Sequence, residues 1–229
     1  MALISSSTVL ADAVVECPGI VPVINRFGIF LGTGDATVGD ACDAAGVAVD
    51  FVLVILNTFV NEEYFPERTF RTYSVERLVK YLEQVNRQYQ QFSLPNIERH
   101  FQSLIRVSGA DSNVPQIYDF FLGVKDALLG AHTADMATWI SDMLDRERES
   151  VSTVGVVAQV PDSSAVNDAV NDLVTMFVRM LSGSTEPNLT YAVLTALSNL
   201  ARDVKQNNRI RDRILVPMYV EMISNSSSR

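Results

Sequence analysis

The sequence predicts an all-α protein, in which a small helical region precedes longer amphipathic helices. Apolar residues recur with the 3.6-residue period of a helix, and the strict alternation typical of half-buried strands is nearly absent. The chain of 229 residues is 48% hydrophobic and 20% charged, which provides enough apolar surface for a folded core. Clusters of Gly, Ser, Asn and Pro separate the periodic segments, as expected for loops between helices.

The first region, residues 1–65, contains four short helical patterns separated by tight turns. We expect helices over 8–15, 21–27, 37–45 and 50–64. Gly28 and Gly46 follow two of them, at the position where glycine commonly ends a helix. Residues 66–73 hold a proline and arginines without an apolar stripe, so we expect a linker there.

The second region, residues 74–223, has longer helical patterns with mostly short connections. This arrangement predicts an antiparallel four-helix bundle. A break is expected at 93–95, a weakly patterned connection over 150–164, and a polar tail at 224–229. The expected helices cover 75–89, 97–107, 115–149, 166–181 and 189–223.

Composition and charge exclude several classes of function. The 18 Lys and Arg stand against 27 Asp and Glu, for a net charge of -9, and no basic cluster stands out, so we expect no nucleic-acid partner. The longest apolar run, 46–60, is interrupted by Asp50 and is shorter than the ~20 residues of a membrane span. The N-terminus lacks the basic start of a secretion signal, so we expect a cytoplasmic protein without a membrane partner.

Polar residues interrupt the apolar stripes of three helices. Asn86 lies in the first, His132 and Asp135 in the second, and Asn207 and Arg211 in the last. Because buried polar groups need partners and helical bundles build their sites from inward-facing side chains, this pattern predicts a central pocket. Asn is a weak metal ligand and Arg stays protonated, so the pattern favours a buried polar network in which Arg211 pairs with Asp135 over a metal site.

Residues 25–42 (NRFGIFLGTGDATVGDAC) carry a resemblance to a known family. They resemble the small N-terminal helical domain of RIC-type proteins, which repair damaged iron centres, in the Bacteroidetes-type variant. Redox-active members of that family have a Cys-Cys pair where this chain has Leu31 and Gly32. The resemblance therefore does not imply thiol chemistry in this turn.

The remainder of the chain is similar to the hemerythrin-like (HHE cation-binding) four-helix bundle. Residues 81–95 (YLEQVNRQYQQFSLP), 132–139 and 207–217 (NNRIRDRILVP) resemble its ligand-bearing helices. The resemblance implies five former metal-ligand positions, of which only the histidine keeps the family's ligand type. These positions are Asn86, His132, Met136, Asn207 and Arg211.

Three functions follow from these observations. The first is a metal-free, non-catalytic interaction or regulatory protein related to iron–sulfur cluster repair proteins, with a protein partner or self-association and no cofactor. The second is an active di-iron or mono-metal protein of iron–sulfur cluster repair and the nitrosative or oxidative stress response, which would use His132 as a ligand. The third is a binder of a small hydrophobic or anionic molecule, with Arg211 as its anchoring charge. Only two histidines are present and neither belongs to a recognisable catalytic motif, so we do not expect an enzyme.

Overall fold

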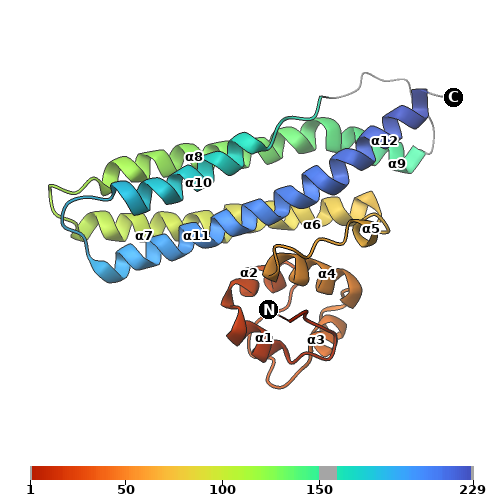
Figure 1. Ribbon diagram of the computed structural model, residues 1–229, viewed down its shortest axis with the longest axis horizontal. Coiled ribbons are helices and arrows are strands. Elements are labelled where there is room, and N and C mark those ends of the chain that lie inside the picture. The colour runs from red at the N-terminus through yellow and green to blue at the C-terminus, as the bar shows by residue number, and fades with distance from the viewer. Residues whose placement is uncertain (1, 150–158, 228–229) are drawn as a thin grey trace. The chain divides into compact units, whose positions relative to one another are not determined.

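The computed structural model describes residues 2–149 and 159–227, in which helices joined by loops and turns form the regular structure (Figure 1). Within these residues the β structure is limited to one isolated bridge between Val9 and Thr37. The predicted all-α class is confirmed. The chain divides into two compact units, Met1–Ser74 and Val75–Arg229.

The first unit contains short helices whose ends are fixed by local hydrogen bonds. Thr37 and Asp40 form a capping box at the start of one helix, and Gly46 ends the same helix with a positive φ of 67°. Both features satisfy backbone groups that a helix end leaves unpaired. The helices are α1 (Leu10–Glu16), the short η1 (Pro18–Ile20), α2 (Val21–Asn25), α3 (Val38–Ala45), α4 (Val49–Val60) and α5 (Glu67–Phe70).

Helix α4 is the core of this unit, because most of its residues are buried. Its Asn57 is 4% exposed and holds the N-terminal segment by two hydrogen bonds. The backbone N–H of Ile4 donates to Asn57 Oδ1 at 2.7 Å, and Asn57 Nδ2 donates to the Ile4 carbonyl at 2.8 Å. The amide side chain thus replaces the hydrogen bonds that burial would otherwise remove.

The linker expected at 66–73 differs from what the structure shows. Residues Glu67–Phe70 form α5, Phe70 is fully buried, and Tyr73 is 7% exposed. The Tyr73 ring packs on Phe51 with 4.8 Å between ring centroids, and its hydroxyl donates to Asp50. Two aromatic side chains are enough to attach this segment to the first unit, although they form no apolar stripe.

The second unit consists of long helices in which π-helical segments join α-helices without a loop (Figure 1). The break expected at 93–95 is such a continuous junction. The helix expected at the C-terminus runs on to Ser227, into the segment that we expected to be a tail. The elements are α6 (Val75–Gln88), η2 (Tyr89–Ser93), α7 (Leu94–Val107), α8 (Val114–Asp135), η3 (Met136–Ile140), α9 (Ser141–Glu149), α10 (Ser164–Met180), α11 (Pro187–Ile210), η4 (Arg211–Leu215) and α12 (Val216–Ser227).

The long helices of the second unit lie side by side around an apolar core (Figure 1). Helix α7 packs against α8 and α11, and α10 packs against the same two helices. Phe101, Phe121 and Phe177 meet in this core, with ring centroids of Phe101 at 5.4 and 5.8 Å from the other two. Most of the connection expected at 150–164 lies outside the described residues, and its described end leads into α10 at Ser164.

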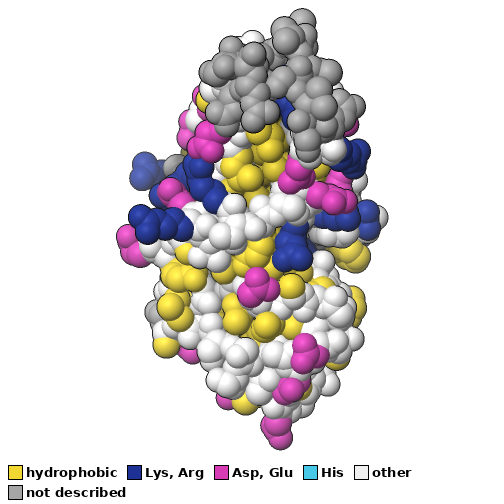
Figure 2. All heavy atoms as spheres, turned by 90° about the vertical axis from the view of Figure 1, so that its right-hand side faces the viewer, with side chains coloured by type: hydrophobic (Ala, Val, Ile, Leu, Met, Phe, Trp, Pro, Cys, Tyr) yellow, Lys and Arg dark blue, Asp and Glu magenta, His cyan; other side chains and the backbone are white. Residues whose placement is uncertain are grey.

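The surface of the described residues carries both signs of charge. On the face that Figure 2 presents, Lys and Arg occur in small groups beside Asp and Glu. In the part of the chain that the structure describes, no helix is long and apolar enough to span a membrane.

Candidate functional site: a polar cavity among the long helices

Three π-helical segments mark the part of the second unit where the sequence places polar residues inside apolar stripes. Segment η2 follows Asn86 by three residues, η3 starts directly after Asp135, and η4 starts at Arg211. A π turn inserts one extra residue and shifts the face that the following residues present, and such turns are frequent at functional sites. The polar positions and the π turns thus coincide on three continuous runs of helix, α6–α7, α8–α9 and α11–α12, which we call rods together with α10.

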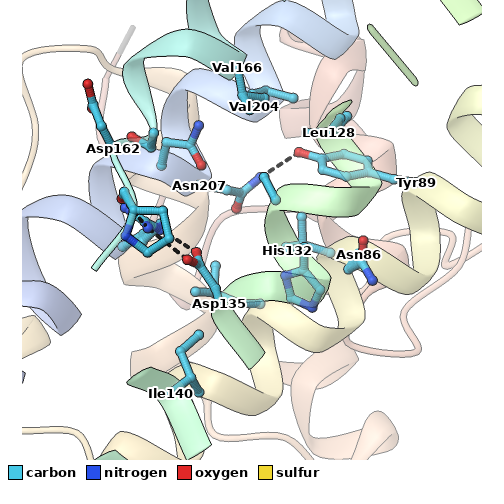
Figure 3. Close-up of a pocket in the computed structure, with 17 residues that line it drawn as sticks. Asn86, Tyr89, Leu128, His132, Asp135, Ile140, Asp162, Val166, Val204 and Asn207 are labelled. Carbon is cyan, nitrogen blue, oxygen red and sulfur yellow. Dashed lines mark hydrogen bonds and ion pairs between the residues drawn. The ribbon is translucent and has the colours of Figure 1, made fainter. Parts of the chain in front are cut away.

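A cavity of about 70 Å³ opens among these rods. It brings together four of the five positions that the resemblance implies as ligands, Asn86, His132, Asn207 and Arg211. Asp135 lies beside them, and Figure 3 labels it together with Asn86, His132 and Asn207. Most of its wall is apolar. The other lining residues are Leu82, Val85, Tyr89, Leu128, Ala131, Ile140, Pro161, Asp162, Ser163, Val166, Val204 and Asn208.

The fifth position, Met136, does not line this cavity. It borders a shallow surface depression that it shares with Asn86 and His132. Met136 is the first residue of η3, where the π turn begins. The resemblance implied that Met136 lies with the other four positions, but Met136 is not among the residues that line the cavity.

Arg211 and Asp135 form a buried, bidentate ion pair across two rods. Arg211 Nε donates to Asp135 Oδ2, and Arg211 Nη2 donates to Asp135 Oδ1 at 2.9 Å. Both side chains are 9% exposed. The prediction that Arg211 lies inside the unit and pairs with Asp135 is confirmed.

Further contacts complete the bonding of this pair. Trp139 Nε1 donates to Asp135 Oδ1 at 2.8 Å, and the Arg211 guanidinium carbon lies 5.4 Å from the centre of the Trp139 ring. Arg211 also donates to the carboxylate of Asp212 and to the carbonyl of Pro161. Burial alone would lower the pKa of Arg211, but its contacts with Asp135 and Asp212 outweigh burial and raise the pKa above its ordinary value.

Asn207 is held in a second buried network. Its Oδ1 accepts from the Tyr81 hydroxyl at 3.0 Å, and its Nδ2 donates to the Tyr89 hydroxyl at 3.1 Å and to the Asp203 carbonyl at 2.7 Å. Figure 3 shows Asn207 facing Tyr89 across the cavity. Because its acceptor and both amide N–H groups have partners, Asn207 acts as a structural bridge between α6 and α11.

Asn86 and His132 are different, because they keep unused hydrogen-bonding capacity. Both are half-buried, and they lie next to each other in Figure 3. Asn86 Oδ1 is buried and has no hydrogen-bond partner among the described residues. Burial lowers the pKa of His132, while the charge of Asp135 opposes this shift, so the site favours the uncharged ring.

The donor set does not fit a di-iron centre. Such a centre needs bridging carboxylates and several histidines. Among the polar residues that the sequence predicted to face inward, Asp135 is the one carboxylate. It already accepts hydrogen bonds from Arg211 and Trp139, and the Arg211 guanidinium places a positive charge beside it. Within the described residues, no group of three or more His, Cys, Asp and Glu side chains is placed to hold a metal ion.

The sequence reasoning missed several residues of the site. Tyr81, which binds Asn207, lies five residues before Asn86 and outside the stripe followed along that helix. Residues 161–163 come from a connection without helical periodicity, and the Pro161 carbonyl binds Arg211. No local signal identifies these residues, because their roles depend on contacts between distant segments.

The chain was compared with protein-family models, with curated proteins and with solved structures, and none of the three comparisons finds a match. The candidate function therefore depends on the geometry of the cavity and on the resemblance of the sequence motifs.

Proposed function

We propose that this chain is a metal-free, hemerythrin-like protein, related to iron–sulfur cluster repair proteins, that acts as a non-catalytic interaction or regulatory module. In this proposal residues 1–74 correspond to the RIC-type N-terminal domain. The rods α6–α7, α8–α9, α10 and α11–α12 correspond to the antiparallel four-helix bundle. Support comes from the mutual packing of these rods and from the sequence motifs that they carry.

The observation that carries the proposal is the ion pair of Arg211 with Asp135. In the hemerythrin-like motif, Arg211 stands at a position for a bridging glutamate. Here its guanidinium donates hydrogen bonds to both carboxylate oxygens of Asp135. Because the guanidinium balances the charge of this carboxylate and binds both of its oxygens, Asp135 is not available to a metal ion.

Metal analysis tests this proposal directly. Protein produced with added iron should contain far less than one iron per chain and should lack the visible absorption of an oxo-bridged di-iron centre. The Arg211→Glu variant, prepared in parallel, replaces the cation by a carboxylate. Iron bound by this variant and not by the unaltered protein would show that Arg211 excludes the metal. Close to two irons per chain in the unaltered protein would overturn the proposal and favour the active iron protein, with His132 and Asp135 among its ligands.

The interaction role has a candidate contact in the first unit. Phe30 and Leu31 are neighbours in a turn between glycines, and their side chains are 65% and 63% exposed. Adjacent exposed apolar side chains are a feature of protein contact sites. We place the contact with a second copy or a related chain at this turn. Light scattering of the eluting protein should show a dimer that the Phe30→Ser, Leu31→Ser double variant loses. A dimer that persists in this variant would exclude the turn as the contact.

The cavity favours a second function, the binding of a small molecule. The unpaired Asn86 Oδ1 and the uncharged His132 ring offer polar contacts at one side of a mostly apolar space. Concave sites with apolar walls and a few polar groups are typical of small-ligand pockets. A screen of small molecules by thermal shift tests this function, and a screen without any stabilising compound would count against it.

A further inference from the structure

The polar groups of the cavity differ in whether they remain available to a ligand. The Arg211 guanidinium is occupied by Asp135, Asp212 and Pro161. The amide of Asn207 is occupied by two tyrosines and a carbonyl. Arg211 was the expected anchor for an anion, but its positive charge is already compensated by two carboxylates.

The groups that remain are hydrogen-bond acceptors. Asn86 Oδ1 is a buried acceptor without a donor among the described residues. The His132 ring forms no hydrogen bond within the described part of the chain, and an uncharged imidazole has one acceptor nitrogen. Both residues border the same cavity and the same surface depression, so their acceptors can serve one ligand.

The charge around the cavity is negative. Its described lining residues include two carboxylates, Asp135 and Asp162, and one cation, Arg211. Asp212, which forms an ion pair with Arg211, adds a third carboxylate nearby. An anionic ligand would meet this excess of carboxylates, whereas a cation would be attracted by it. The apolar residues of the wall, such as Leu82, Val85 and Leu128, suit short alkyl groups.

The size of the space limits the ligand. An engineered apolar cavity of about 150 Å³ accommodates the six carbons of benzene, so a cavity of about 70 Å³ suits a ligand of roughly three heavy atoms. We infer that the cavity binds a small alkylammonium ion whose N–H groups donate to Asn86 and His132 while its alkyl groups contact Leu82, Val85 and Leu128. A secondary amine such as dimethylammonium has two N–H donors for these two acceptors. The inference rests on the small-molecule function proposed above.

Isothermal titration of the full chain with dimethylammonium chloride tests the inference at constant ionic strength. Tetramethylammonium is the control cation without an N–H donor, and sodium acetate is the control anion. We expect heat of binding with dimethylammonium and at least tenfold weaker binding of the two controls, since acetate lacks the positive charge and tetramethylammonium both lacks an N–H donor and is larger than the cavity.

Variants assign the binding to the cavity. Asn86→Leu removes the unpaired acceptor and should weaken dimethylammonium binding about tenfold or more. Asn96→Leu is the same change at an exposed position of the same rod, outside both the cavity and the depression, and should leave binding unchanged. Ala131→Leu fills the cavity from a different rod and should abolish binding, which provides a second readout if Asn86→Leu does not fold.

Each contrary outcome has a distinct meaning. Tighter binding of acetate than of dimethylammonium would overturn the inferred ligand class and leave the small-molecule function standing. Dimethylammonium binding that survives both Asn86→Leu and Ala131→Leu would place the ligand elsewhere and overturn the inference. An absence of binding by all three probes would overturn the inference, and the broader thermal-shift screen would then decide the small-molecule function independently.

Discussion

Arg211 shows how a single residue sets the chemistry of the cavity. Its guanidinium joins Asp135 on one rod to Asp212 on its own rod and to the carbonyl of Pro161. The sequence indicated this pairing because Arg211 and Asp135 both interrupt apolar stripes. Its additional partners could not be predicted, since Asp212 is a neighbour that could equally face water and Pro161 lies in an unpatterned segment.

Removal of the arginine alone should be strongly destabilising. In Arg211→Met the buried Asp135 carboxylate keeps Trp139 but loses its cation, which is expected to cost about 3 kcal/mol or more of unfolding free energy. Arg213→Met, two residues further on at an exposed position, should change it by less than about 0.5 kcal/mol. Urea denaturation measures both.

A double-variant cycle identifies the origin of this loss. Asp135→Asn, Arg211→Met removes both charges and leaves an acceptor for Trp139, so it should be more stable than Arg211→Met. Equal stability of the single and double variants would mean that the unpaired carboxylate is not the cause.

The environment of His132 should make the stability of the protein depend on pH. Burial lowers its pKa in the folded protein, with Asp135 opposing the shift, below the value of about 6.5 for an unfolded chain. As the pH falls below about 6.5, the unfolded chain therefore takes up this proton first, and the unfolding free energy decreases. The decrease should be seen between pH 7.5 and 5.5 and should be reduced in His132→Gln.

The second histidine provides the control for this experiment. His100→Gln should keep the pH dependence of the unaltered protein, because His100 does not line the cavity. If His132→Gln kept the full slope and His100→Gln lost it, the dependence would belong to the other histidine.

Among the elements of the second unit, the π segments are the ones that the sequence did not reveal. Periodicity identified the long helices because a 3.6-residue repeat is local information. It did not identify η2, η3 and η4, because a π turn shifts the repeat by one residue and leaves a helical pattern on both sides. The break expected at 93–95 is one consequence, and the position of Met136 outside the cavity is another.

Gly183 carries a prediction for the loop between α10 and α11. It has a φ of +80°, and a Cβ atom there would lie 2.5 Å from the Cα of Ser112 in the loop before α8. Gly183→Ala should therefore lower the unfolding free energy by about 2 kcal/mol or more, from backbone strain and from the clash.

Gly123 is the matched control inside α8. A Cβ atom there would have no neighbour within 4 Å, so Gly123→Ala should raise the unfolding free energy by about 0.5–1 kcal/mol through its better helix propensity. Opposite signs in thermal unfolding would confirm the loop contact, whereas a neutral Gly183→Ala would contradict it.

The whole molecule distributes its charge unevenly. Residues 1–74 hold three Arg against nine Asp and Glu, a net charge of -6, and the remaining residues contribute 15 basic and 18 acidic side chains, a net charge of -3. The unit with the exposed Phe30 and Leu31 is therefore the more acidic one. Two copies that meet at that turn bring like charges together, so their association should strengthen as the ionic strength rises.

Chelation tests the metal-free proposal on the whole molecule. If the proposal holds, no bound metal contributes to folding, and treatment with EDTA should shift the melting temperature by less than about 1 °C. A site whose metal stabilised the fold by about 1 kcal/mol would lower the melting temperature by about 2–4 °C when emptied. Such a decrease, reversed by added iron, would contradict the proposal.

Three features could be predicted from the amino-acid sequence: the helical class, the polar positions that line the cavity, and the pairing of Arg211 with Asp135. Each of these follows from local periodicity and from the need of a buried charge for a counter-charge. Other features became known only from the folded chain: the burial of Phe70 and Tyr73, the two tyrosines that bind Asn207, and the full set of partners of Arg211. Most of these depend on which distant segments approach one another, because Tyr81 and Asn207 are 126 residues apart, and Arg211 and Pro161 are 50 apart.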